Sequence, residues 1–313
     1  MTADPRIHIS LPHLRGLEGA ARGLSFLPKQ ASTSVLNGRH ASRLRGRGLN
    51  FEEMRDYLPG DDIRSIDWKA TARTGSPHVR VFTEERDRPA LLVVDQSMSM
   101  FFGTQLNMKS VTAAEAAAIA AFRVLDVGDR VGGIVFDDDD QIEFVPKRNR
   151  RTVYAFLEAI ANANVALNAD RQVKARSGGL NGILKRVARI AHHDHLVIVF
   201  SDFDGIDELT HRHLSGIAHH NDLILMHVHD PAAEGLKAGQ RAIIGNSDMQ
   251  AELDLGSAST REAVDAYSRD RIARINRWQQ EINLSVLPLS AGEETLPQIR
   301  QLMGRLAPRR RVR

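Results

Sequence analysis

Three oxygen-bearing side chains follow an apolar run in the stretch LLVVDQSMSMFFG, which spans residues 91–103. The run ends at Asp95, and Ser97 and Ser99 follow at intervals of two residues. Burial of a strand does not require oxygen atoms in this pattern. One interpretation is a capped turn, because Asp and Ser side chains readily bond to nearby backbone N–H groups. The other is that the three side chains converge on a ligand.

A second group of oxygen atoms follows another apolar run, in VIVFSDFDG, where Ser201, Asp202 and Asp204 come after the predicted strand. Ligands of open α/β sheets bind outside the carboxyl ends of the strands, so both groups are expected at one edge. The RSGG segment at 176–179 precedes a predicted helix and is a third candidate contributor. Two carboxylates and several hydroxyls suit Mg²⁺, which prefers oxygen ligands. Asp202 and Asp204 could alternatively cap the helix predicted near Leu209.

The elements that must position these side chains begin near Pro89, where apolar runs alternate with helical patterns. This alternation predicts an α/β fold with a mostly parallel sheet and helices on both faces. The near-continuous apolar runs indicate strands that are buried on both faces. Strands are predicted at 91–94, 131–136, 195–200, 222–228 and 284–289, and helices at 109–125, 152–163, 180–191, 209–219 and 260–282. Hairpins are predicted at 133–145, with Asp137 to Asp140 at a solvated tip, and at 241–255.

The composition changes along the 313 residues and predicts three segments: an irregular N-terminal arm at 1–88, the sheet domain at 89–306 and a basic tail at 307–313. With 42% hydrophobic and 26% charged residues, the chain is typical of a globular protein that buries a core. The absence of cysteine excludes disulfides and thiolate metal sites. The start lacks the pattern of a signal peptide and no apolar run is long enough to span a bilayer, so we expect a cytoplasmic protein.

The residues alone leave two functions open, nucleic-acid binding and Mg²⁺-dependent catalysis. Basic runs at 39–47, 147–151 and 309–313 could bind nucleic acid, but no aromatic residues or recognised motif accompany them. A Mg²⁺-dependent hydrolase or phosphoryl-transfer enzyme could use Asp95 and Asp202, because two carboxylates can hold a catalytic metal. A haloacid-dehalogenase-like enzyme needs a second Asp two residues after the first, and this chain has a serine there. This difference counts against a haloacid-dehalogenase-like enzyme.

The Asp-x-Ser-x-Ser pattern after one strand, with an Asp after a later strand, resembles the metal-ion-dependent adhesion site of von Willebrand factor A domains. The segments RGLNFEEMRDYLPGDDIRSIDWKATAR, VRVFTEER, LLVVDQSMSMFFG and GDRVGGIVF extend the resemblance over roughly residues 43–255. They resemble the MoxR-associated, von Willebrand A-like domain-of-unknown-function family (number fifty-eight). The PGDD-x-R-x-IDW signature at 59–68 is the most specific part of the match. The resemblance implies a von Willebrand A-like, Rossmann-type α/β fold.

The resemblance also implies a site for a divalent cation, expected to be Mg²⁺. In it Asp95, Ser97 and Ser99 are ligands from the first loop, and Asp202 is a ligand from the last loop. The family usually has a threonine in the middle loop, and this chain departs from that pattern. The nearest hydroxyl is Ser177, so either a shifted loop presents Ser177 or the site binds metal weakly.

The same resemblance implies a non-enzymatic interaction module that works with a MoxR-type AAA+ ATPase in the assembly or maturation of other proteins. An acidic side chain of a protein partner is expected to complete the coordination of the metal. The arm is a second candidate surface, either bracing the sheet domain, which Val79, Val81 and Trp68 are expected to cover, or docking a partner. Its candidate partner-binding residues are Asp61, Asp62, Arg64, Asp67 and Trp68.

Overall fold

The computed structural model describes residues 4–22, 24, 49–58, 63–84, 88–168, 179–231, 241–246, 249–254, 258–282 and 284–306. The chain divides into two compact units. The sheet unit consists of Met1–Pro28 together with Arg88–Arg313, and the small unit is Lys29–Asp87. The small unit is therefore an insertion in the sequence of the sheet unit.

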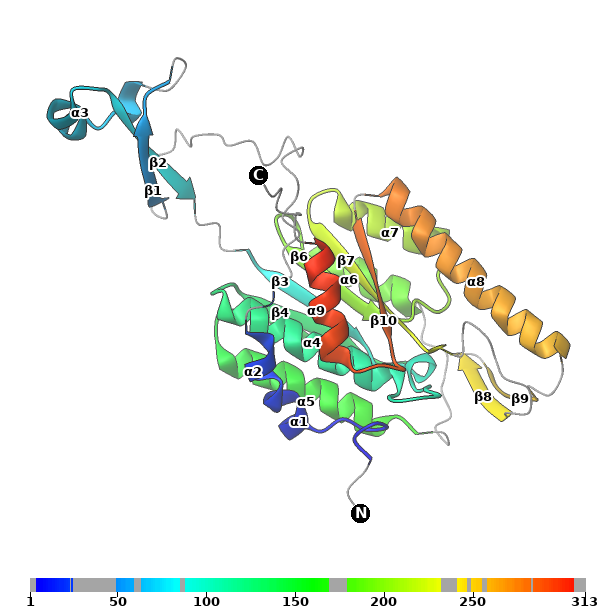
Figure 1. The fold of residues 1–313 in the computed structure, drawn as a ribbon. Helices are drawn as coiled ribbons and strands as arrows, with labels where there is room; N and C mark the ends of the chain where they lie inside the picture. The colour runs from blue at the N-terminus through cyan, green and yellow to red at the C-terminus, as the bar shows by residue number, and fades with distance from the viewer. Residues whose placement is uncertain are drawn as a thin grey trace. The chain divides into compact units, whose positions relative to one another are not determined.

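The sheet unit is built on a six-stranded sheet with the order β10-β7-β6-β3-β4-β5 (Figure 1). Neighbouring strands are parallel except for β5, which pairs antiparallel with β4. The strands are β3 (Ala90–Asp95), β4 (Val131–Phe136), β5 (Gln141–Lys147), β6 (Leu196–Ser201), β7 (Asp222–His229) and β10 (Leu284–Ser290). The predicted α/β fold with a mostly parallel sheet is confirmed. Both predicted hairpins are also present, as β4–β5 and as β8 (Arg241–Asn246) with β9 (Met249–Asp254).

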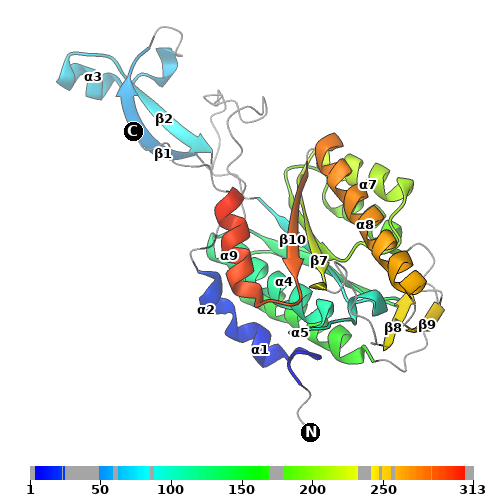
Figure 2. The same ribbon diagram turned by 45° about the vertical axis from the view of Figure 1, so that its right-hand side comes forward.

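Helices cover both faces of this sheet (Figures 1 and 2). Leu92 and Val94 of β3 belong to the core on one face, while Leu91 and Val93 belong to the core on the other. The first face packs against α4 (Lys109–Asp126), α5 (Arg150–Ala166) and α9 (Thr295–Leu306), and α1 (Leu11–Gly16) and α2 (Glu18–Ala21) pack on α4 and α5. The second face packs against α6 (Gly179–Ile190), α7 (Glu208–Ala218) and α8 (Ala258–Glu281). No helix in the described part of the chain has both the length and the apolar character needed to cross a membrane.

The first residues of the chain belong to the sheet unit, so the prediction of a single arm over residues 1–88 is wrong for this part. Ile9, Leu14 and Ala21 are at most 1% exposed and lie in the same core as α4 and α5. Helix α1 begins after Ser10, whose hydroxyl accepts a hydrogen bond from the His13 N–H. Its six residues are too few for hydrophobic periodicity to indicate a helix from the sequence.

The small unit contains an antiparallel pair of strands, β1 (Leu49–Asp56) and β2 (His78–Glu84), with helix α3 (Trp68–Thr74) between them in sequence. The strand predicted at 78–86 is therefore present. Helix α3 begins after Asp67, whose Oδ1 accepts hydrogen bonds from the N–H groups of Lys69 and Ala70 at 3.0 and 3.1 Å. Such a cap satisfies backbone donors that the first helical turn leaves without partners.

Candidate metal centre

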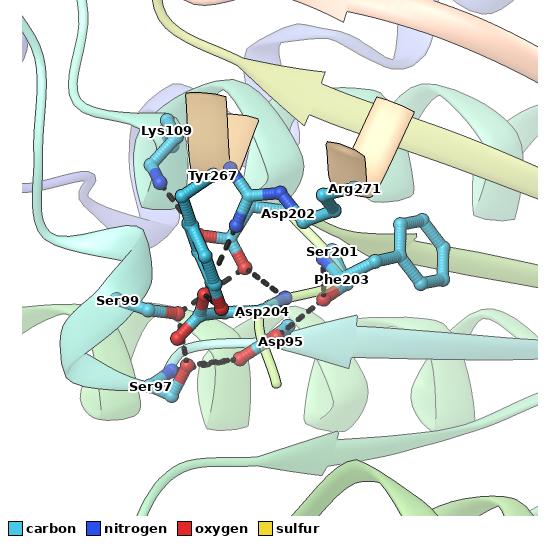
Figure 3. A network of polar contacts seen from close by, with 10 residues as sticks. All are labelled: Asp95, Ser97, Ser99, Lys109, Ser201, Asp202, Phe203, Asp204, Tyr267 and Arg271. Atoms are coloured by element: carbon cyan, nitrogen blue, oxygen red, sulfur yellow. Dashed lines mark hydrogen bonds and ion pairs between the residues drawn. The ribbon is translucent and has the colours of Figure 1, made fainter. Parts of the chain in front are cut away.

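The site begins at the carboxyl end of β3, where Asp95 is only 5% exposed. Its Oδ1 accepts hydrogen bonds from the N–H and the hydroxyl of Ser97, at 2.9 and 2.6 Å. The Ser97 and Ser99 hydroxyls lie 3.1 Å apart (Figure 3). The loop is therefore a capped turn, as one interpretation of the sequence held, and it also gathers three oxygen-bearing side chains.

The neighbouring parallel strand β6 delivers the second carboxylate to the same place (Figure 3). The Ser201 hydroxyl donates to Asp95 Oδ2 at 2.6 Å, and the Ser99 hydroxyl donates to Asp202 Oδ1 at 3.2 Å. The structure thus brings the predicted side chains of both loops together. Ser177, the predicted contribution of the middle loop, lies outside the described residues.

A lysine that sequence reasoning missed lies beside Asp202. Lys109 is the first residue of α4, and its Nζ donates to Asp202 Oδ2 at 2.5 Å. The two side chains are 10% and 2% exposed, so this is a buried ion pair. The only signal in the sequence was a lysine at the start of a predicted helix, a place where a positive charge opposes the helix dipole.

The pKa values of the two buried carboxyl groups are shifted in opposite directions. Burial and the neighbouring charge of Asp202 raise the pKa of Asp95 to about 7, although serine hydroxyls donate to it. Burial would also raise the pKa of Asp202, but the charges of Lys109 and Arg271 outweigh it and lower that pKa to about 2. Asp202 is therefore the ionised member of the pair, and Asp95 keeps its proton until the pH is near neutral.

Helix α8 contributes two side chains to the second loop. Tyr267 Oη and Arg271 Nη1 both donate to Asp204 Oδ1, at 2.9 and 3.1 Å (Figure 3). The alternative that Asp202 or Asp204 caps α7 is wrong, because the cap is Asp207, which forms a reciprocal capping box. The sequence predicted the helix at 260–282 but gave no sign that it lies at this edge of the sheet.

Phe203 connects the two acidic residues of this loop in a left-handed backbone conformation, with φ of 55°. This region is uncommon for a bulky residue and costs on the order of 1–3 kcal/mol. The Phe203 N–H donates to the Ser201 hydroxyl at 2.9 Å, and the side chain is fully buried. These contacts stabilise a turn that the backbone alone disfavours.

Buried amides hold the first loop in place. Gln96 and Asn164 are both 0% exposed, and Asn164 Nδ2 donates to Gln96 Oε1 at 2.9 Å. Asn164 Oδ1 accepts the Ile9 N–H at 2.8 Å, while Gln96 Nε2 donates to the Ser110 carbonyl at 3.0 Å. The N-terminal segment is thereby linked to the residue between the first two candidate ligands.

The β4–β5 hairpin also supports the first loop. Asp138 is 7% exposed, and its Oδ2 accepts the Met98 N–H at 2.7 Å. The prediction of a fully solvated tip is therefore wrong for Asp138, because this side chain bonds to the backbone of the site. Asp137 Oδ1 closes the tip itself by accepting the N–H groups of Asp139 and Asp140 at 2.8 and 2.7 Å.

The donor set fits a hard divalent cation. Contacts of 2.6, 3.1 and 3.2 Å link Asp95 to Ser97, Ser97 to Ser99 and Ser99 to Asp202, so the oxygens of these side chains lie close together. Carboxylate and hydroxyl oxygens suit Mg²⁺. Burial and, second to it, the neighbouring charge of Asp202 raise the pKa of Asp95, and a bound cation would favour the ionised form of this carboxyl. Across the described residues, no group of three or more His, Asp or Glu side chains could hold a metal. A metal at this edge would therefore depend on hydroxyl ligands.

The candidate residues of the small unit have different surroundings. Asp61 and Asp62 lie outside the described residues. Asp67 is 8% exposed and caps α3, which gives it a structural role. Arg64 is exposed, and Trp68 is 63% exposed. Arg64 and Trp68 remain candidates for contact with a partner.

Fold and site together define an α/β protein whose mostly parallel sheet carries two carboxylates, hydroxyls and a lysine at its carboxyl edge. The sequence matches the family described as protein of unknown function DUF58 over residues 53–274, and the chain belongs to this family. The suspected family is thus confirmed.

Relatives in two mycobacteria are similar over most of the chain. The uncharacterized protein Mb1516 of Mycobacterium bovis and the uncharacterized protein Rv1480 of Mycobacterium tuberculosis are each 31% identical over 259 residues, covering 82% of this chain and 77% of the relative. Among solved structures, the conserved hypothetical protein BatB from Bacteroides thetaiotaomicron has a TM-score of 0.41 at 14% identity, covering 70% of this chain and 98% of that one. An aerotolerance-related membrane protein from Bacteroides fragilis has a TM-score of 0.39 at 13% identity, covering 70% and 99%.

Proposed function

We propose that this chain is a non-enzymatic interaction module that binds Mg²⁺ at the carboxyl edge of its sheet and recognises an acidic side chain of a protein partner. The observation that supports the proposal is the convergence of Asp95, Ser97, Ser99 and Asp202 from two adjacent loops. Two carboxylates and two neutral hydroxyls would hold the cation. The bound ion would supply an electrophilic centre for an incoming carboxylate.

The partner that we propose is a MoxR-type AAA+ ATPase, and the pair would act in the assembly or maturation of other proteins. The basis is the resemblance of the PGDD-x-R-x-IDW signature and the Asp-x-Ser-x-Ser loop to the MoxR-associated family. Membership of the family described as protein of unknown function DUF58 agrees with this basis. The exposed Arg64 and Trp68 offer a second contact surface on the small unit.

A Mg²⁺-dependent hydrolase or phosphoryl-transfer enzyme is the alternative function, in which Asp95 and Asp202 would hold a catalytic metal. We prefer the binding module because Ser97 stands two residues after Asp95, where a haloacid-dehalogenase-like enzyme needs a second Asp. Hydrolysis of p-nitrophenyl phosphate with Mg²⁺ separates the two functions. Turnover that disappears in an Asp95→Asn variant would favour the enzyme.

A titration of a MoxR-type ATPase tests the proposal directly. Wild-type protein should bind the ATPase more tightly with Mg²⁺ than with chelator, and Asp95→Ala should weaken binding and remove the metal dependence. Asp126→Ala serves as the matched control, because Asp126 lies at the opposite end of α4 from Lys109 and its side chain is 47% exposed. Equal affinity of wild type and Asp95→Ala, with and without Mg²⁺, would show that the site does not mediate recognition.

A further inference from the structure

Lys109 occupies a position that helix stability and solvation both disfavour. It is the first residue of the 18-residue helix α4, where a positive charge opposes the helix dipole. Its side chain is 10% exposed, so the ammonium group has lost most of its contact with water. Burying a charge is costly unless the charge is paired, and Asp202 is the partner that compensates here.

Lys109 and the loop residues bind different oxygens of the Asp202 carboxylate. Lys109 Nζ donates to Oδ2, while Oδ1 accepts the Ser99 hydroxyl at 3.2 Å and the Asp204 N–H at 3.1 Å (Figure 3). The carboxylate is thus held with Oδ1 toward the hydroxyls of the first loop. The Phe102 ring lies with its centroid 5.9 Å from Nζ and adds a cation–π contact.

The lysine also changes the charge available to a cation. Arg271 is ion-paired with Asp204 at 3.1 Å and also contributes to the low pKa of Asp202. The candidate ligands include two carboxylates, Asp95 and Asp202, and Lys109 is the ammonium group that donates directly to one of them. The number of ligand charges tunes the affinity of oxygen-ligand sites for divalent cations, and Lys109 offsets one of the two.

We infer that Lys109 is a built-in counter-cation that sets the divalent-cation affinity of this site, weakening Mg²⁺ binding and holding Asp202 in place when no metal is bound. The inference rests on the proposed function, which supplies the cation. It assigns to Lys109 a role in affinity that is separate from recognition of the partner.

Calorimetric titration of the full chain with MgCl₂ and with MnCl₂ tests the inference. Lys109→Met removes the charge and keeps most of the side-chain volume, and it should bind both ions at least about tenfold more tightly than wild type. Lys109→Gln should show the same direction, and it guards against a variant that fails to fold because its amide can still donate to Asp202. Lys109→Arg, which keeps the charge, should stay close to wild type. Lys185→Met, at an exposed lysine on α6, is the matched control and should change nothing.

Thermal melting in chelator provides a second measurement that involves no metal. Lys109→Met and Lys109→Gln should melt at a lower temperature than wild type in chelator, and Mg²⁺ should restore more stability to them than to wild type. Equal affinity of wild type and both uncharged variants would overturn the inference and leave the proposed metal site standing. No binding of either ion to any of these proteins would overturn the proposed metal site and the inference together.

Discussion

Replacement of Asp95 by Asn should stabilise the metal-free protein at neutral and higher pH, although it removes a central residue of the candidate site. The folded protein holds the Asp95 proton with a pKa of about 7, against the ordinary value of 3.8. Between these two values the folded state binds more protons than the unfolded state, so the free energy of unfolding falls as the pH rises. At about 1.4 kcal/mol for each pKa unit, the loss in the wild type amounts to about 4 kcal/mol.

Urea unfolding in chelator, followed by circular dichroism between about pH 4 and about pH 8, measures this effect. Asparagine has nearly the shape of a protonated aspartate and cannot ionise. The free energy of unfolding of the variant therefore does not fall with pH through this group. The stability difference should widen with pH in favour of Asp95→Asn and level off above about pH 7. Comparison with the wild type at each pH cancels the contributions of groups that both proteins share. A difference that stays constant or narrows as the pH rises would refute the reasoning.

The matched variant Asp202→Asn should have the opposite effect and lower the free energy of unfolding. The pKa of Asp202 is lowered to about 2, so its ionised form stabilises the folded state above about pH 4, and this stability is lost as the pH falls through about 2. At neutral pH the substitution should cost at least about 2 kcal/mol, because it also leaves the Lys109 ammonium buried without its carboxylate. If both variants shifted stability in the same direction, the two carboxylates would not have the separate roles described above.

Further expectations concern the N-terminal segment and the small unit. Leu14→Ala, at a position that is 0% exposed, should lower the free energy of unfolding by about 3–5 kcal/mol in urea, and Leu58→Ala, at a 59% exposed position, by less than about 0.5 kcal/mol. Asn164→Ala should cost about 2–4 kcal/mol in the same assay, because it leaves two buried hydrogen-bonding groups without a partner. Replacing Lys29–Asp87 by a short flexible linker should preserve a single cooperative transition, whereas removing residues 1–88 should abolish it; equal behaviour of the two deletions would contradict the division of the chain.

The strands of the sheet could be predicted because burial on both faces leaves a clear pattern. The runs at 91–94 and 131–136 are short and apolar and lie on either side of the predicted helix at 109–125, and both are strands in the structure. Helix α1 left no such pattern, because its six residues include few apolar positions and its burial depends on α4 and α5. The first helices of the chain are therefore a consequence of tertiary packing more than of local sequence.

The site likewise contains residues whose position follows from the local sequence and others whose position depends on tertiary packing. Asp95 and Asp202 could be located because the topology of a parallel sheet fixes where a residue after a strand must lie. Lys109, Asp138 and Arg271 could not, because each reaches the loops from an element whose placement depends on the whole core. Charges on a predicted helix or hairpin tip are usually solvated, and their sequence positions alone do not show which of them turn inward.

The small unit is joined to the sheet unit at both of its ends, and this has a mechanical consequence. Its second connection leads through Arg88 and Pro89 into β3, which pairs along its length with β4 on one side and β6 on the other. A pulling force applied through this connection would therefore act on the hydrogen bonds of β3 to both β4 and β6 at the same time. The same strand ends at Asp95, so a force-generating partner that grips the small unit would pull on the strand that carries the first candidate metal ligand.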